Sequence, residues 1–262
     1  MNAYLAALQT ESLKAFRSKV PVLTMLGFFI APLIGGLFMV ILKDPEAAKS
    51  MGLIGTKAQL TAGVADWPTF FNLLAQATAI GGAIIFAIVT TWVFGREFSD
   101  HTVKELLSLP TSREAIIAAK FTVIVLWTLT LTLLSYGLGL IVGNAVVIPG
   151  WSSELLRSAT VDILGAGILT IMLLPFVAFL ASIGRGFMAA FGWAIFTVAI
   201  AQIAVVMGWG SWLPWSVPAL FSGAVGPRAE VLGMHSYIIV ALSSAIGFFI
   251  TFYWWRNADQ TK

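Results

Sequence analysis

Long stretches without charge constrain this chain more than any other feature of its sequence. Between Lys19 and Lys43 lie twenty-three consecutive uncharged residues, and a helix of about 20 apolar residues crosses the roughly 30 Å hydrocarbon core of a bilayer. Only 10% of the 262 residues are charged and 59% are apolar, whereas an ordinary soluble domain is about 25% charged. A soluble core of this size could not bury so much apolar surface. We therefore expect an all-α, polytopic membrane protein.

The same pattern predicts a single transmembrane domain over residues 1–262. The expected spans lie at about 20–42, 70–95, 115–147, 162–183, 187–207 and 236–255. Residues 43–66 mix charge with glycine and threonine and predict an aqueous loop. The segment 208–235 is aromatic, broken by proline and glycine and almost uncharged. Irregular backbone at membrane depth needs protein or water as a partner, so this segment is expected to be re-entrant or to lie in the membrane interface.

The N-terminal segment 1–19 differs from a secretory signal, because its basic residues follow its apolar positions instead of preceding them. On a helical wheel an apolar face is formed by Tyr4, Leu5, Leu8, Ala15 and Phe16, and a polar face by Thr10, Lys14 and Arg17. This pattern predicts an elbow helix that lies in the membrane surface. We expect Lys14, Arg17 and Lys19 to lie near anionic headgroups.

A polar segment at 96–120 separates the second and third expected spans. Ser99 or Asp100 can cap a short helix with apolar positions at i, i+3 and i+4, namely Val103, Leu106 and Leu107, and Pro110 ends it. Thr111 followed by Glu114 then reads as a capping box that opens the next helix. The sequence predicts a short amphipathic helix within 96–114, held crosswise between two long apolar helices.

The distribution of lysine and arginine predicts the orientation. Six spans place both termini on one side. That side would hold ten of the fifteen basic residues: Lys14, Arg17, Lys19, Arg96, Lys104, Arg113, Lys120, Arg185, Arg256 and Lys262. The other side would hold Lys43, Lys49, Lys57, Arg157 and Arg228. By the positive-inside rule, the termini and the short helix face the cytoplasm, and a prokaryotic plasma membrane is the expected location.

The sequence lacks the motifs of several classes of enzymes and carriers. Cysteine is absent, and no phosphate-binding Gly-x-x-x-x-Gly-Lys-Ser/Thr loop, Gly-x-Ser-x-Gly elbow or His-Glu-x-x-His pair occurs. Almost no ionisable residue falls within an expected span, although proton-coupled carriers and pumps usually need one. Both histidines, His101 and His235, fall in expected loops. We expect no catalytic, metal or cofactor site in this chain, and any ATP-driven work must come from another polypeptide.

Four uncharged polar residues fall within the spans: Asn72, Gln76, Asn144 and Gln202. Side chains of this kind form hydrogen bonds between helices, and they could also line a translocation path. The sequence leaves both interpretations open.

The polar segment carries a family resemblance in four short motifs: Arg96-Glu97-Phe98, Thr102-Val103-Lys104-Glu105-Leu106-Leu107, Leu109-Pro110 and Ser112-Arg113. It resembles the loop between spans two and three of type-2 ABC exporter permeases, and is most similar to six-span permeases of the bacitracin-resistance and lantibiotic-immunity kind. Many of those relatives have glycine before the threonine, where this chain has His101. The layout of elbow helix, six spans and broken aromatic segment is also similar.

The resemblance implies an export permease without ATPase activity of its own. It would form a dimer, of identical copies or with a sister permease, and bind two cytoplasmic ATPase subunits that hold ATP and magnesium. The short helix would be a coupling helix. Its implied contacts with the ATPase are Glu97, Asp100, Thr102, Val103, Lys104, Glu105, Leu106 and Leu107, with the apolar members docking and the charged members setting register. The expected cargo is an amphipathic peptide, an antibiotic or a lipid-like molecule, and no feature indicates a nucleic-acid partner.

Two alternatives stay open. A self-contained channel or secondary carrier would need an ion-binding site within the spans or an inverted repeat, and neither is visible. A non-transporting membrane anchor for an ATPase would share the same loop. An ATPase gene beside this one would disfavour the channel or carrier.

Overall fold

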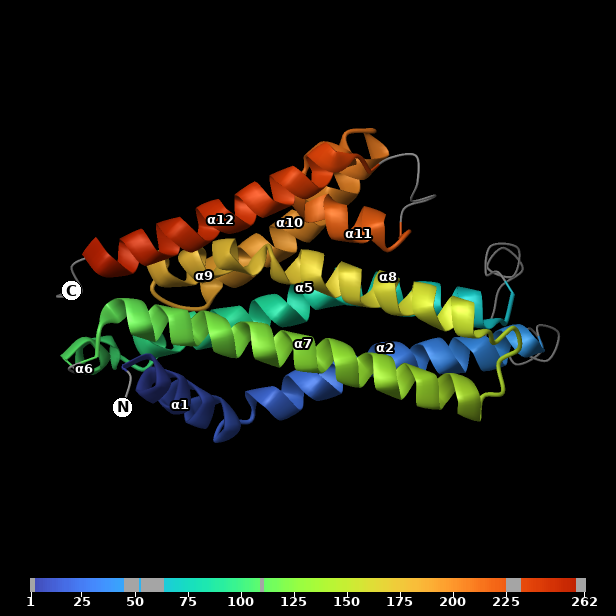
Figure 1. Cartoon of the computed structure of the whole chain (residues 1–262), viewed down its shortest axis with the longest axis horizontal. Helices are drawn as coiled ribbons and strands as arrows, with labels where there is room; N and C mark the ends of the chain where they lie inside the picture. The colour runs from blue at the N-terminus through green and yellow to red at the C-terminus, as the bar shows by residue number, and fades with distance from the viewer. Residues whose placement is uncertain (1–2, 45–51, 53–63, 109–110, 225–231, 258–262) are drawn as a thin grey trace.

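A computed structural model describes residues 3–44, 52, 64–108, 111–224 and 232–257. Within these ranges every regular element is a helix (Figure 1). The helices are α1 (Ala3–Phe16), α2 (Val20–Lys43), α5 (Trp67–Ser99), α6 (Val103–Ser108), α7 (Arg113–Ala145), α8 (Ser153–Ile171), α9 (Leu174–Ile183), α10 (Met188–Val206), α11 (Val217–Phe221) and α12 (Met234–Asn257), with the 3₁₀ turns η1 (Gly210–Trp212) and η2 (Pro214–Ser216). The all-α prediction is confirmed.

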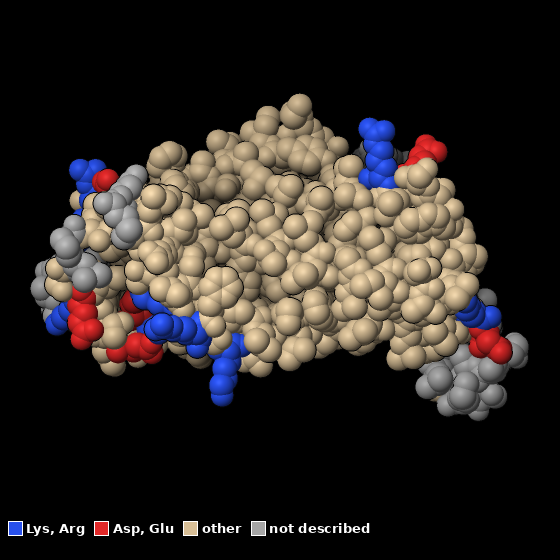
Figure 2. All heavy atoms as spheres, turned by 60° about the horizontal axis from the view of Figure 1, so that its bottom comes forward, with Lys and Arg blue, Asp and Glu red and all other residues tan. Residues whose placement is uncertain are grey.

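Among the described residues, six helical segments are long and apolar enough to cross a membrane: Val20–Lys43, Trp67–Ser99, Arg113–Ala145, Ser153–Ile183, Met188–Val206 and Met234–Asn257. On the face that Figure 2 shows, charged side chains gather toward the two ends of the molecule, and a broad uncharged belt separates them. Such a belt matches the hydrocarbon core of a bilayer. The chain is therefore a multi-pass membrane protein, as its composition predicts. The expected aqueous loop at 43–66 lies mostly outside the described residues.

The fourth span differs from its predicted extent of 162–183. It begins at Ser153, because the Ser152 side chain accepts a hydrogen bond from the backbone N–H of Leu155 and caps the helix there. The span is also interrupted. α8 ends at Ile171 and α9 restarts at Leu174, with Pro175 in its first turn, where proline is tolerated.

Glycines allow the spans to pack closely. A Cβ atom on Gly139 would lie 2.5 Å from Cδ1 of Leu74, and one on Gly143 would lie 2.3 Å from the Trp67 ring. This pair on α7 therefore brings α7 against α5. On α12, a Cβ on Gly247 would lie 2.6 Å from the backbone nitrogen of Phe176. Small residues of this kind let membrane helices approach each other's backbones.

The segment expected to be re-entrant or interfacial forms η1, η2 and α11, and 225–231 lies outside the described residues. It packs on the helices beside it. The ring centroid of Trp215 lies 5.7 Å from that of Phe176 and 5.3 Å from that of Trp193. Ser236 at the start of α12 donates to the carbonyl of Ser211 at 2.9 Å. Its irregular backbone is thus held against protein, while its depth in a membrane stays a prediction.

Both ends of the described chain and the short helix α6 lie at one end of the molecule (Figure 1). α1 lies beside α7 at this end, and the C-terminal end of α12 reaches it as well. We call this the α6 end. It brings together the segments that the sequence analysis singled out, from the elbow helix to the polar loop.

Candidate functional site at the base of helix α6

A tight backbone turn connects α5 to α6. The N–H of Thr102 donates to the carbonyl of Glu97 at 2.9 Å, and the N–H of His101 donates to that of Phe98 at 3.3 Å. These two bonds form a Schellman motif, which ends a helix with one residue in the left-handed conformation. That residue is His101, with φ 57°. Glycine takes this conformation without the steric cost that a side chain brings, which explains physically why glycine in similar permeases suits this position.

Helix α6 turns its apolar side toward the chain's own core. Val103 and Leu106 are both 8% exposed and belong to the same buried cluster as Phe98 and Ile117. Little of either side chain is left on the surface, and the expectation that these two residues dock on an ATPase stays a prediction. Helical spacing directs them at i and i+3 onto one face, and the nearest apolar surface is the end of the bundle.

Among the described side chains of α6, those that face solvent are polar. Lys104, Glu105 and Ser108 are exposed, and Thr102 at its start is half-buried. Leu107 belongs to the same helix. Asp100 is exposed and pairs with Arg96 at 3.2 Å. Of the eight residues expected to contact an ATPase, those that leave a charged side chain on the surface are Asp100, Lys104 and Glu105.

Glu97, in the last turn of α5, is only 3% exposed, and its expected role in setting the register of an ATPase contact stays a prediction. Its Oε1 atom accepts from Lys120 Nζ at 2.7 Å and from Lys14 Nζ at 3.0 Å. Glu11 completes the group, because its two carboxylate oxygens accept from Lys14 at 2.6 Å and Lys120 at 3.0 Å. These four residues, hereafter the ion-pair cluster, join α1, α5 and α7.

Lys120 is the centre of the ion-pair cluster. It is 0% exposed, and its third hydrogen bond goes to the carbonyl of Val93 at 2.7 Å. An ammonium group has three donors, so all are used. Two lysines face two carboxylates, so the cluster is formally neutral. Within the described residues, only Oε2 of Glu97 in this cluster lacks a hydrogen-bond partner.

Hydrogen bonds from Arg113 connect α12 to the start of α7. Arg113, the first residue of α7, donates from Nη1 to the carbonyls of Trp255 at 3.1 Å and Arg256 at 3.3 Å. The Trp255 ring is 1% exposed and donates from Nε1 to Oγ of Ser182 at 2.8 Å. The second, third and sixth spans and α1 therefore meet at the α6 end. The cap of α7 is Ser112, one residue later than the expected Thr111.

The ion-pair cluster was not foreseen from the sequence. From the sequence Lys120 counts only among the basic residues on one side of the membrane, and Glu11 has no assigned partner. A signal was present, because Tyr4, Leu8 and Ala15 recur at helical spacing and Glu11 falls on the same stripe. Leu5 and Phe16, expected on the same apolar face, are 53% and 82% exposed, and the expectation that this face lies in the membrane surface stays a prediction. A carboxylate within an inward-facing stripe needs a buried cation.

The four polar residues considered for a translocation path lie in separate places. Gln76 donates to Asn72 at 2.6 Å, within α5. Asn72 lines a hollow of about 410 Å³ with Asp162 and Ser222, whereas Asn144 lines another, of about 500 Å³, beside Trp67 and Trp151.

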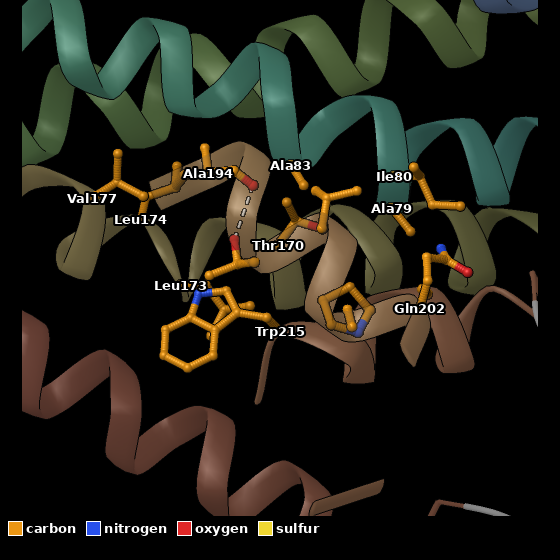
Figure 3. A pocket seen from close by; sticks show the side chains of 15 residues that line it. Ala79, Ile80, Ala83, Thr170, Leu173, Leu174, Val177, Ala194, Gln202 and Trp215 are labelled. Carbon is orange, nitrogen blue, oxygen red and sulfur yellow. Dashed lines mark hydrogen bonds between the residues drawn. The ribbon is translucent and has the colours of Figure 1, made fainter. Parts of the chain in front are cut away.

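Gln202 lies on the rim of a smaller cavity, of about 40 Å³, between α5, α9, α10 and the η2–α11 segment. Figure 3 shows Gln202 and Trp215 on opposite sides of it. The rest of its lining is mostly alanine and leucine side chains with Thr170 and Thr197. Such a volume holds little more than water, so the four residues do not form one path within a single copy.

These features define a class: a six-span helical membrane protein with an N-terminal helix packed at one end and a short helix between its second and third spans. The family model described as "ABC-2 family transporter protein" matches residues 7–202 of this chain. The chain therefore belongs to the ABC-2 transporter family. It is 26% identical over 195 residues to the bacitracin transport permease protein BCRB of Bacillus licheniformis, covering 73% of this chain and 91% of that protein. The resemblance seen in the polar loop is thereby confirmed, and the chain is a transporter permease subunit.

Proposed function

We propose that this chain is the membrane subunit of an ATP-driven exporter, and that force from a separate ATPase enters it through α6. The observation that carries this proposal is the ion-pair cluster beneath α6. It joins α1, α5 and α7 through buried charge-assisted hydrogen bonds, which are shorter and stronger than neutral ones. A push on α6 would therefore move several helices together.

In this proposal the ATPase contacts the polar side of α6. Lys104, Glu105 and Asp100 offer exposed charges there, and complementary charges set the register of an interface more than its affinity. The buried residues Val103 and Leu106 transmit displacement to the bundle instead of docking. ATP and magnesium belong to the partner subunit. Both chain termini and α6 then face the cytoplasm of a prokaryotic cell.

The proposed cargo is an amphipathic peptide antibiotic, a class supported by the similarity to a bacitracin transport permease. Since the four polar candidates do not line one passage in a single copy, a path at the interface with a second permease copy or a sister permease is favoured. Two ATPase subunits closing on ATP would bring two α6 helices together and switch that path. A ligand shifts such an equilibrium only by its differential affinity for the two states.

The ion-pair cluster also bears on the alternative of a secondary carrier, which needs a charged site among its spans. Its two carboxylates are already matched by two lysines, so it has no excess negative charge to hold a foreign cation. It also lies at the α6 end and not at mid-membrane, where carriers place their sites. These features favour a structural junction over an ion-coupling site.

The decisive experiment measures bacitracin-stimulated ATP hydrolysis in proteoliposomes that contain the full chain and the ATPase subunit that co-purifies with it. Glu105→Lys reverses an exposed charge in the first turn of α6. It should keep the chain folded but reduce co-purification of the ATPase and stimulated hydrolysis about tenfold, the range of a lost charged interface contact.

Glu154→Lys is the matched control, because Glu154 is also an exposed glutamate in the first turn of a helix, but at the opposite end of the molecule. It should leave hydrolysis unchanged. Equal activity of the Glu105 and Glu154 variants would overturn the role of α6. Movement of cargo without any ATPase would support the carrier, and ATPase binding without cargo movement would support the membrane anchor.

A further inference from the structure

A charged hollow opens beside the ion-pair cluster, between α1, the end of α5 and the turn before α10. It has a volume of about 510 Å³ and is lined by Thr10, Leu13, Lys14, Arg17, Ser18, Trp92, Arg96, Asp100 and Phe187. Three of these side chains are cations and one is an acid. Figure 2 shows blue and red side chains gathered at this end of the molecule, next to the uncharged belt.

The charges around this hollow leave one positive charge in excess. Arg96 pairs with Asp100 at 3.2 Å. Lys14 is shared between Glu11 and Glu97 within the neutral ion-pair cluster. Arg17 has no ion pair among the described residues, and it is exposed. The hollow therefore has an unbalanced guanidinium, a group that binds phosphate oxygens in a bidentate manner.

The surroundings of the hollow are those of a membrane interface. The Trp92 ring lies 5.1 Å from the guanidinium carbon of Arg96, and tryptophan is enriched at headgroup level. Phe187 on its rim is 38% exposed. The opposite face of α1 lines an apolar hollow of about 280 Å³ with Phe16 and Trp127. A helix with a charged hollow on one face and an apolar one on the other is suited to the surface of a bilayer.

We propose that this hollow binds the phosphate of an anionic phospholipid, with Arg17 as the principal contact and Arg96 and Lys14 as neighbouring cations. The single excess charge matches the net charge of a phosphatidylglycerol headgroup, whereas a zwitterionic headgroup brings its own cation and gains less. Juxtamembrane basic residues are attracted to anionic lipid in this way. The proposal depends on the chain being a membrane protein and not on its cargo or ATPase.

The test compares lipid retention by purified full-length protein. Wild type is incubated with mixed vesicles of phosphatidylglycerol and phosphatidylcholine, extracted in mild detergent and analysed for bound lipid by native mass spectrometry. Wild type should retain phosphatidylglycerol over phosphatidylcholine. Arg17→Gln should reduce that preference about fivefold, the typical effect of one basic residue near an anionic surface.

Lys104→Gln is the matched control, because Lys104 is an exposed cation at the same end of the molecule that does not line the hollow. It should keep the wild-type preference. Equal losses from both variants would overturn the site in favour of a general surface charge effect. A second arm adds inorganic phosphate at constant ionic strength. Displacement of lipid by millimolar phosphate would overturn the lipid as occupant and assign the hollow to a free anion.

Discussion

Lys120 and Glu97 form an ion pair that is shielded from solvent, with Nζ 2.7 Å from Oε1 and exposures of 0% and 3%. Lys120 lies on α7 and Glu97 on α5, so the pair joins the two spans that flank α6. Removing one member of a buried pair leaves an uncompensated charge in a medium that solvates it poorly. The pair therefore links α5 to α7, and its loss should destabilise the packing of helices at this end of the bundle.

Lys120→Met should destabilise the protein by about 3 to 5 kcal/mol, because Glu97 and Glu11 would then share a single cation. Thermal unfolding in detergent, followed by circular dichroism, measures the loss as a lower midpoint. Adding Glu97→Gln to Lys120→Met should recover part of it, since the remaining Lys14 and Glu11 balance each other. An unchanged midpoint in Lys120→Met would contradict the burial seen here.

The turn at His101 allows a stabilising substitution. With φ 57° its backbone is left-handed, which costs a residue with a side chain roughly 1 kcal/mol relative to glycine. His101→Gly should therefore raise the unfolding midpoint, while His101→Val should lower it, because a β-branched side chain fits this conformation worst. If valine were tolerated as well as glycine, the turn would have another conformation in the membrane.

Gly247 tests the contact between α12 and α9. A Cβ there would lie 2.6 Å from the nitrogen of Phe176 and 2.9 Å from the carbonyl carbon of Pro175, and backbone atoms cannot rotate away. Gly247→Ala should cost about 1 to 3 kcal/mol of stability. Gly192→Ala is its control, because nothing lies within 4 Å of that Cβ position, and a more helix-favouring residue should be neutral or stabilising. Thermal unfolding of both variants separates the outcomes.

The fold was accessible from the sequence because the membrane requires long uncharged helices, and six such runs are visible along the chain. The ends of those helices were less accessible. Ser152 caps α8 well before the start at about 162 that hydropathy gave, since a cap is a local hydrogen bond that hydropathy does not register. The capping box did better at α7, whose cap is Ser112, one residue after the expected Thr111.

The sequence predicted where the candidate site lies, but not which of its residues are buried. The loop motif located α6, but it could not show that Val103 faces inward or that Glu97 lies beneath the surface. Those facts depend on partners far away in the chain. Glu11 lies 109 positions from Lys120, and only the packing of α1 on α7 brings them together. Charge on a predicted helix is easily assigned to solvent when its counter-ion is distant in sequence.

The tie between Arg113 and the end of α12 gives a last prediction. Its guanidinium donates to two carbonyls in the last turn of α12, those of Trp255 and Arg256, and the last carbonyls of a helix need partners other than its own backbone. Arg113→Ala should leave those carbonyls to solvent and fray the last turn of α12, while Trp255 keeps its bond to Ser182. Hydrogen exchange at residues 253–257 should then become about fivefold faster, as expected for losing roughly 1 kcal/mol of hydrogen bonding.

Arg157→Ala serves as the comparison for that measurement, because Arg157 is an exposed arginine on α8, far from α12's final turn. Arg113→Lys should give an intermediate rate, since an ammonium can reach one carbonyl but lacks the planar fork that holds two. Exchange should remain slow around Gly247, where α12 is held by α9 rather than by Arg113. Faster exchange along all of α12 in Arg113→Ala would instead mean that this arginine supports the whole helix, and the assignment of a local tie would be wrong.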